Sequence, residues 1–530
     1  MKWIAALASS AFILALPAQA ADITIGVAAE PSAMDPHYHN LGPNNAMKRH
    51  IFESLIIQDE TQALTPGLAT SWKALDDTTW QFDLRQGVKF HDGSDFDAED
   101  VIYTLQRVPN VPNSPSSFAI YTKSLESLEA KDPHTLIIKT PGPRPLLPVE
   151  LSNISIISKE AADAAVAGYK AAGGDAPDWP KTEDFNDGTL AVGTGPYTFG
   201  EYIKGEKIVL NANDNWWGGK ADWDKVTFRP ISSNGPRVAA LLAGDVDLID
   251  NPPTQDMAAL EENPDIELVQ GLSNRVIYLH FDHFEEPSPG ITGTDKNPFK
   301  DARVREAVSK AINREAIVER IMGGVAVPAA QLLPPGMFGN NPNLKMTAYD
   351  PEGAKALLAE AGYGDGFELV LGTPNDRYIN DEKVAQAIAQ MLTRVGIKTT
   401  VDASTKSVFF KRRNKYEFSL YLAGWGSGTG EMSSPLRALV GTPNKDTGFG
   451  GTNRGRYSNP DMDGVLEEAL QTIDDPTREA LLQEASKIVM EDYGILPLHY
   501  EVTVWAMRKG VDYTPRTDQY TVATSAKPSN

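Results

Sequence analysis

Residues 416–437 read YEFSLYLAGWGSGTGEMSSPLR, an apolar stretch that stops in glycines, a tryptophan and one acid. Phe418, Leu420 and Leu422 recur at every second position, which is the period of a β-strand. Glycines at 424, 426, 428 and 430 then permit backbone conformations that a side chain would forbid. In open α/β sheets, ligands bind beyond the carboxyl ends of strands. The stretch therefore predicts a strand that ends in a ligand-binding loop.

The side chains of this loop suit a binding site. Trp425 offers a flat aromatic surface, and hydroxyls follow at Ser427 and Thr429. Glu431 supplies the only carboxylate of the loop. A mobile surface loop with a partly buried tryptophan is the alternative interpretation. We favour ligand contact, because four glycines around one tryptophan make a poor core.

The first twenty residues have the pattern of a secretory signal peptide. Lys2 precedes an apolar run at 3–16, and the small-residue sequence Ala18-Gln19-Ala20 follows. The run is too short to span a bilayer. We expect cleavage after Ala20 and a soluble periplasmic protein. The chain contains no cysteine, so we expect neither a disulfide nor a lipid on an N-terminal cysteine.

The net charge and the length of the chain further limit the class of protein and its partners. The 530 residues carry a formal net charge of −22, and the densest basic cluster is only Lys411-Arg412-Arg413 with Lys415. Nucleic acid is therefore not an expected partner, because a polyanion needs a basic surface. With 41% hydrophobic residues, the chain is long enough for more than one core. We expect a monomer with at least two lobes.

Residues 64–107 predict a strand, a turn and a helix. Trp80, Phe82 and Leu84 alternate as a strand. Asp97 is placed as the N-cap of the helix, with Asp100 three residues later. The acids around residue 95 look faintly like a calcium loop, but its central glycine is absent, so helix capping is the better interpretation.

The order of residues in WKALDDTTWQFDLRQGVKFHDGSDFDAEDVIYTLQR at 72–107 resembles the family 5 extracellular solute-binding proteins of ABC importers, which serve peptides, nickel and related solutes. The resemblance covers essentially the whole chain after residue 20. It continues through VGTGPY at 192–197, NWWGGK at 215–220, RVAALLAGDVD at 237–247 and GRYSNPDMD at 455–463.

The resemblance implies an α/β, two-lobed periplasmic binding protein fold (type II, cluster C-like) with an extra inserted subdomain in lobe I. Lobe I is expected at 21–271 with the insertion at about 61–190, lobe II at 272–497, and a C-terminal return to lobe I at 498–530. The crossovers are placed near Leu272 and Leu498. Ligand would be enclosed between the lobes and delivered to the permease subunits of an importer at the inner membrane.

Helices and strands alternate after residue 300. Asp301 caps a helix that Gly323-Gly324 is expected to end, and Asp350 with Pro351 begins another. Such alternation predicts a largely parallel sheet covered by helices. The expected strands lie at 368–371 and 398–401, and the last helices near 460–473 and 477–492.

Charge and resemblance together suggest the ligand class. A closed peptide site needs an acid for the ammonium and an arginine for the carboxylate, since burying either unpaired is costly. The dipeptide- and oligopeptide-binding branches carry an aspartate shortly after the Gly-Trp pair, whereas residues 426–445 contain none. The run GWGSGTGE is closer to the glutathione-binding branch. We therefore favour glutathione or a short peptide, with Glu431 meeting its cationic group.

Four further residues are candidate ligand contacts. Arg413 matches a position where the oligopeptide-binding branch resembles this chain in carrying an arginine near the ligand. Arg437 follows the loop directly. Arg275 and Tyr278 are candidates by their position at the predicted crossover.

Other functions remain as alternatives. The same fold could bind an oligosaccharide, an opine, a metal chelate or haem, and a periplasmic hydrolase or chaperone-like protein is a different class. The motifs GxSxG, HExxH and CxxC do not occur, so we expect no enzyme, no catalytic residue and no cofactor. The pairs His37 with His39 and His280 with His283 lack good ligand spacing, so no metal site is expected.

Overall fold

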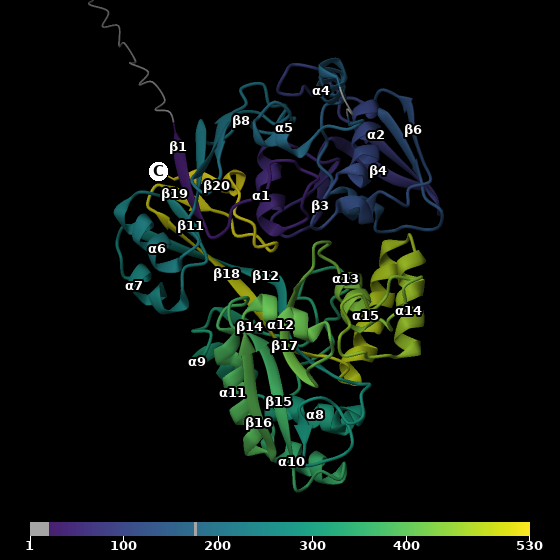
Figure 1. Ribbon diagram of the computed structural model, residues 1–530, viewed down its shortest axis with the longest axis vertical. Coiled ribbons are helices and arrows are strands. Elements are labelled where there is room, and N and C mark those ends of the chain that lie inside the picture. The colour runs from purple at the N-terminus through teal and green to yellow at the C-terminus, as the bar shows by residue number, and fades with distance from the viewer. Residues whose placement is uncertain (1–20, 174–176, 530) are drawn as a thin grey trace, which may run out of the picture.

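Two long antiparallel strands, β12 (Ile266–Phe281) and β18 (Leu496–Arg508), run from one lobe of the protein to the other (Figure 1). The computed structural model describes residues 21–173 and 177–529, so the expected signal peptide lies outside the described residues. The C-terminal strand β18 thus returns the chain to the lobe that contains the N-terminal strand. The two-lobed α/β fold is confirmed.

The register of β12 and β18 shifts where they pass between the lobes. Leu272 pairs with Val502, and pairing resumes at Val276 with Tyr500, before a second shift between Ile277 and Tyr278. In the gap, the Ser273 hydroxyl donates to the Glu501 carbonyl oxygen at 2.9 Å. Leu272 and Leu498, the expected crossover positions, both lie within these strands, and the lobe boundaries stay a proposal.

One twelve-stranded sheet extends through both lobes. Its order is β13-β15-β17-β12-β18-β11-β1-β10-β9-β8, with β14 beside β18 and β16 beside β15. Its other strands are β1 (Asp22–Val27), β8 (Tyr197–Ile203), β9 (Lys207–Ala212), β10 (Lys225–Pro230), β11 (Leu248–Asp250), β13 (Ile291–Thr292), β14 (Ala326–Pro328), β15 (Phe367–Pro374), β16 (Ile397–Ser404) and β17 (Leu420–Gly426).

The prediction of a largely parallel sheet is wrong. Among the named strands of the described chain, parallel pairing is confined to β1 with β10 and β11, and to β15 with β16 and β17. These are pairs for which helices such as α11 (Asp381–Arg394) and α12 (Lys406–Arg413) supply the crossover. The long strands and the β8–β9 hairpin add antiparallel pairs, which the helix–strand alternation does not reveal.

A separate four-stranded antiparallel sheet lies in the N-terminal lobe. Its order is β4 (Ala69–Asp76), β5 (Thr79–Leu84), β7 (Thr135–Lys139) and β6 (Ser127–Asp132), and it has its own buried apolar cluster around Phe82 and Ile138. This sheet supports the expected insertion at about 61–190, which stays a prediction. Two small pairs complete the strands: β2 (Ile56–Gln58) with β3 (Leu64–Pro66), and β19 (Val511–Tyr513) with β20 (Ala526–Pro528).

Helix starts follow the predicted caps. Asp97 and Asp100 form a capping box on α2 (Ala98–Arg107), and Asp350 caps α10 (Pro351–Glu360). Asp301 caps α8, but this helix ends at Ala311 rather than at the glycines, because Asn313 caps a new helix. The remaining helices are α1 (Gly42–Ile51), α3 (Leu147–Leu151), α4 (Lys159–Ala172), α5 (Thr182–Asn186), α6 (Asn234–Ala243), α7 (Met257–Glu261), α8 (Ala302–Ala311), α9 (Arg314–Arg320), α13 (Ser433–Pro435), α14 (Pro460–Gln471) and α15 (Asp475–Glu491).

Two segments that carry the family resemblance, 192–197 and 215–220, meet at Glu53, which lies just after α1. The Glu53 carboxylate accepts hydrogen bonds from Nε1 of Trp216 at 3.1 Å, from Nε1 of Trp217 at 2.7 Å and from the Thr194 hydroxyl at 2.8 Å. These contacts hold the loops of the N-terminal lobe together. None of the helices in the described part of the chain has the length and apolar character that crossing a membrane requires.

Candidate ligand-binding site

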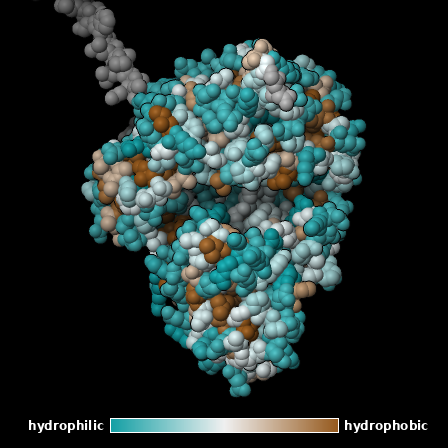
Figure 2. All heavy atoms as spheres, in the orientation of Figure 1, coloured by the Kyte–Doolittle hydropathy of each residue, from teal (hydrophilic) through white to brown (hydrophobic). Residues whose placement is uncertain are grey.

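A cavity of about 460 Å³ lies between the lobes, and we call it the arginine cavity. Figure 2 shows the surface hollowed between the two lobes. Lobe I contributes residues at the start of α1 and residues near the C-terminus, including Asp518 and Tyr520. Five of the eight predicted site residues line this cavity, namely Arg275, Tyr278, Arg413, Trp425 and Ser427.

Strand β17 brings the predicted residues together by pairing with β12. Gly426 lies opposite Arg275, and Ala423 lies opposite Tyr278. The strand continues past Gly424, where the loop was expected to begin, through Trp425 to Gly426. Gly424 is needed within the strand for packing, since a Cβ there would lie 2.8 Å from the ring of Tyr378. Of the four glycines predicted to need special backbone angles, only Gly430 has a positive φ, of 70°.

Arg413, at the end of α12, faces the cavity without a carboxylate partner among the described residues. Its guanidinium lies 4.8 Å from the ring centre of Phe410, and its Nε has no hydrogen-bond partner there. Arg377 also lines the cavity, rests 5.1 Å from the ring of Tyr378, and has no ion pair within the described chain. Two guanidinium groups are therefore available for an anion.

Arg275 and Tyr278 are more constrained. Arg275 Nε lies 3.4 Å from a Glu501 carboxylate oxygen and donates to the Gln519 side-chain oxygen at 2.9 Å. Tyr278 is only 1% exposed, and burial raises the pKa of its phenol well above the ordinary value. Arg275 is thus partly neutralised, while Tyr278 forms the floor of the cavity.

The glycine-rich loop after β17 is held by side-chain amides of Gln58 and Gln62 from lobe I and of Asn274 from the crossing strand β12. The Ser427 carbonyl oxygen accepts from Asn274 Nδ2 at 2.7 Å and from Gln62 Nε2 at 3.3 Å. Gln58 Nε2 lies 3.4 Å from the carbonyl oxygens of Gly428 and Thr429. The loop therefore bridges the lobes through its backbone, and the Ser427 hydroxyl is buried against the Glu431 carbonyl oxygen.

Thr429 and Glu431 lie on the other side of this loop. Glu431 is 4% exposed, and its Oε2 lies 2.5 Å from Arg478 Nη1. Its second oxygen accepts from the Ser433 hydroxyl. Both carboxylate oxygens of Glu431 thus have partners inside the protein, and they face a second interlobe cavity rather than the arginine cavity.

Arg437 lies outside both cavities and donates from Nη2 to the Thr447 carbonyl oxygen at 2.8 Å. Among the histidines, His37 Nε2 lies 2.7 Å from the Ser155 carbonyl oxygen and His280 Nδ1 lies 2.8 Å from the Tyr421 hydroxyl. Burial lowers the pKa of His37 to about 3. These side chains have structural roles.

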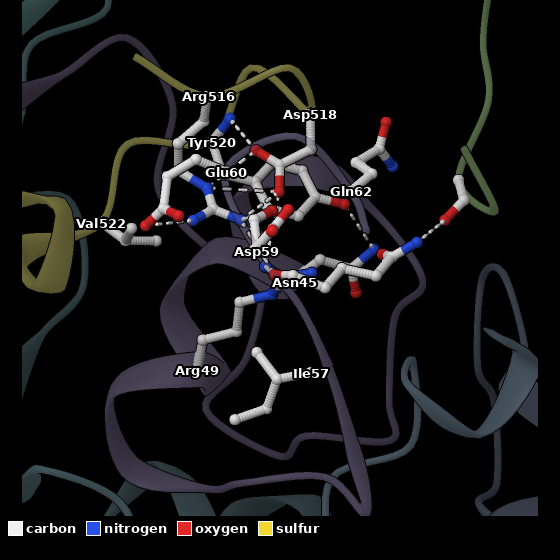
Figure 3. Close-up of polar contacts among 12 residues, drawn as sticks. Asn45, Arg49, Ile57, Asp59, Glu60, Gln62, Arg516, Asp518, Tyr520 and Val522 are labelled. Carbon is white, nitrogen blue, oxygen red and sulfur yellow. Dashed lines mark hydrogen bonds and ion pairs between the residues drawn. The ribbon is translucent and has the colours of Figure 1, made fainter. Parts of the chain in front are cut away.

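Arg516 organises the lobe I side of the cavity (Figure 3). Its Nη2 donates to Asp518 at 2.7 Å and to the Asp59 carbonyl oxygen at 3.1 Å, and Arg49 lies 3.3 Å from the same Asp518 carboxylate. Asp518, which lines the arginine cavity, is therefore neutralised by two arginines. The formal net charge of the residues that line the arginine cavity is therefore positive.

Sequence reasoning did not single out Arg377, Tyr378, Gln62 or Asn274. Arg377 and Tyr378 follow β15, whose carboxyl end reaches the same edge of the sheet as that of β17. The rule that ligands bind beyond strand ends could have found this pair. Gln62 and Asn274 are 212 residues apart and carry no local signal.

Comparison with known proteins identifies the class. The sequence model described as "Bacterial extracellular solute-binding proteins, family 5 Middle" matches residues 63–447. The chain therefore belongs to the family 5 extracellular solute-binding proteins, the periplasmic substrate-binding components of ABC importers.

Individual relatives differ in what their names say they bind. Heme-binding protein A of Haemophilus influenzae is 30% identical over 86% of this chain and 83% of its own. Glutathione-binding protein GsiB of Salmonella paratyphi A is 30% identical over 96% of this chain and 95% of its own. The periplasmic binding protein DppA of Helicobacter pylori, solved with the peptide STSA, is similar in structure with a TM-score of 0.75 and 26% identity, covering 96% and 98% of the two chains.

Proposed function

We propose that this protein captures a peptide-like solute, a short peptide or a glutathione-like molecule, in the interlobe cleft and delivers it to the permease of an ABC importer. The observation that carries the proposal is the pair Arg377 and Arg413, which line one cavity and have no carboxylate partner among the described residues. Arg413 is half-buried and Arg377 is exposed at the rim of the cavity. A carboxylate that binds a guanidinium in bidentate fashion would supply the missing partner.

The remaining walls of the arginine cavity suit the rest of a small peptide. Trp425, Tyr378 and Phe410 supply aromatic surface for apolar atoms. Asn40 and Asn45 supply side-chain amides from lobe I. The arginines give one end of the cavity positive charge, and the other walls offer neutral hydrogen-bonding groups and apolar surface. This combination favours a peptide with a carboxylate over a neutral sugar.

We assign direct ligand contact to Arg275, Arg413 and Trp425, and add Arg377. Tyr278 and Ser427 line the same cavity but are buried, so we propose that they shape it from below. Thr429 and Glu431 line the second interlobe cavity, so we propose that any contribution they make to ligand binding comes from that side of the loop. The protein is proposed to act as a monomeric periplasmic receptor without catalysis. Closure of lobes 21–271 and 272–497 around the solute would present a shape that the permease recognises.

Haem is the second candidate, because a relative named for haem binding is 30% identical. Haem carries two propionates, which the same arginines could bind. The two interlobe cavities are lined by tyrosines and a methionine but by no histidine of the described chain. Titration with hemin, followed by its visible absorption, separates this candidate from peptide capture.

Mass spectrometry of the native protein should identify a co-purified solute. Calorimetry with glutathione and with its dimethyl ester then tests the arginines, because the ester lacks both negative charges. Arg413→Gln and Arg377→Gln should each weaken binding of the free acid roughly tenfold or more. Arg394→Gln, an exposed arginine at the end of α11, is the matched control. Equal affinity for acid and ester in the native protein would reject the proposal for this ligand class.

A further inference from the structure

A second cavity, of about 630 Å³, lies on the other side of the glycine-rich loop, again between the lobes. We call it the tryptophan cavity, since Trp72 and Trp80 of the four-stranded sheet form one wall. Phe338, Glu431, Arg478 and Glu479 form the opposite wall from lobe II. The proposed contacts in the arginine cavity do not use this space.

The tryptophan wall follows from strand register. Ala74 of β4 pairs with Trp80 of β5, and Trp72 pairs with Phe82. Trp72, Ala74 and Trp80 therefore share one face of the sheet, and the small Ala74 leaves that face open. An aromatic face of this kind attracts a cation through its ring quadrupole.

The opposite wall is acidic. Asp475, Arg478 and Glu479 lie three and four residues apart on one face of α15, and Glu431 approaches them from the glycine-rich loop. Arg478 is already engaged, at 2.5 Å from Glu431 and at 2.8 Å from Asp475. Three carboxylates against one arginine give the cavity a formal net charge of −2.

The two cavities have opposite charge and adjoin at one residue. The arginine cavity contains Arg275, Arg377 and Arg413 against Asp518, a formal net charge of +2. Gln62 lines both cavities. The cleft thus carries opposite charge on the two sides of Gln62, whose side chain is buried. A ligand that occupied both sides would place an anion at one end and a cation at the other.

Two residues that line the tryptophan cavity each carry a buried donor without a partner in the described chain. Trp80 is 6% exposed, and its Nε1 has no hydrogen-bond partner in the described chain. Arg478 is 7% exposed, and its Nε also lacks one there. An unsatisfied buried donor costs free energy that an acceptor would recover. A peptide supplies carbonyl acceptors and, with lysine or arginine, the cation that the carboxylates require.

We propose that the tryptophan cavity is a subsite for a cationic side chain, an alkylammonium or a guanidinium, of a peptide whose carboxylate lies in the arginine cavity. The inference rests on the proposed peptide capture and narrows the solute class to basic peptides. Glu479 provides the charge that the protein itself does not neutralise, since it forms no ion pair within the described residues.

Calorimetry with the tripeptides Ala-Lys-Ala and Ala-norleucine-Ala tests the subsite, because the two differ mainly in the terminal ammonium. Native protein should prefer the lysine peptide roughly tenfold. Glu479→Gln should remove most of this preference and leave the affinity for the norleucine peptide unchanged. Glu484→Gln, an exposed glutamate on the same helix outside both cavities, should keep the preference.

The outcomes separate this inference from the proposed function. Equal binding of both tripeptides, or a preference that survives Glu479→Gln, overturns the cationic subsite while peptide capture stands. If neither tripeptide binds, peptide capture fails for these probes, and a titration with 1,5-diaminopentane decides the subsite. Binding of the diamine that is lost in Glu479→Gln supports it, and the absence of binding overturns it.

Discussion

The side-chain oxygen of Gln62 accepts a hydrogen bond from Asn274 Nδ2 at 2.6 Å, at the point where β12 leaves lobe I. The same Asn274 amide donates to the Ser427 carbonyl oxygen of lobe II at 2.7 Å. Both side chains are buried. This pair of amides, together with the longer contacts of Gln58, joins the N-terminal hairpin region to the binding loop.

Removing Gln62 should favour the open form. Gln62→Ala leaves one buried Asn274 donor unsatisfied, which costs about 1–3 kcal/mol in the closed arrangement. Small-angle scattering of the unliganded variant should give a larger radius of gyration than that of native protein. Gln106→Ala, an exposed glutamine on α2, is the control. Unchanged scattering for Gln62→Ala would show that the amide pair does not hold the lobes.

Glu431 and Arg478 should be strongly coupled in stability. Glu431→Gln alone leaves a buried guanidinium short of its partner, which costs about 3–5 kcal/mol. Arg478→Met should cost a similar amount. The double variant should cost much less than the two together, as measured by urea unfolding. Strict additivity would mean that the 2.5 Å contact is absent in solution.

The exposed pair of Glu484 and Lys487 on the same helix provides the comparison. These side chains lie 3.4 Å apart in solvent, so breaking their contact should cost under about 1 kcal/mol. Comparing the loss of stability for the buried and the exposed pair distinguishes the effect of burial from the effect of removing a charge.

Glu53 should make stability depend on pH. Burial raises the pKa of its carboxyl to about 7, above an ordinary value of 4.5, although the Trp217, Thr194 and Trp216 donors oppose the shift. For an acid whose folded pKa is raised, the stabilising contribution is present below pH 4.5 and is lost as pH rises through 7. The expected loss in the free energy of unfolding is roughly 3 kcal/mol.

Glu53→Gln should flatten this dependence. Urea unfolding between pH 4.5 and 7.5 should show a smaller fall in stability for Glu53→Gln than for native protein. Glu160→Gln, an exposed glutamate on α4, should retain the native slope. Identical slopes for native protein and Glu53→Gln would contradict the assignment.

The exported protein should begin at Ala21. Ala18 and Ala20 have the small side chains that suit signal-peptide cleavage. N-terminal sequencing of periplasmic protein checks this directly. Recovery of a chain that begins at Met1 from the membrane fraction would reject it.

Local signals were the ones that sequence reasoning interpreted correctly. The caps at Asp97, Asp301 and Asp350 start helices because the side chain and its backbone partner lie within three residues. Strand β17 was found for the same reason, since its apolar pattern is continuous. The split between α8 and α9 was missed because Asn313 is a cap inside an otherwise helical pattern.

Contacts between residues far apart in the chain could not be predicted from the sequence. Glu431 was expected to meet a cationic ligand group, and its nearest cation in the structure is Arg478, 47 residues away. No spacing rule links these positions, nor Gln62 to Asn274. The division of the candidate residues between two cavities also depends on which face of the loop each side chain takes, which glycine-rich sequence does not fix.

The register shift at Ser273 has an entropic consequence. Because β12 and β18 remain paired on both sides of the shift, the lobes are joined by a hydrogen-bonded ribbon at this crossing, not by loose tethers. A flexible linker would have to lose conformational freedom each time the cleft closed. In this protein the backbone of the ribbon is already ordered by folding. Closure of the cleft therefore costs little further conformational entropy at this crossing, and more of the free energy of the ligand contacts contributes to affinity.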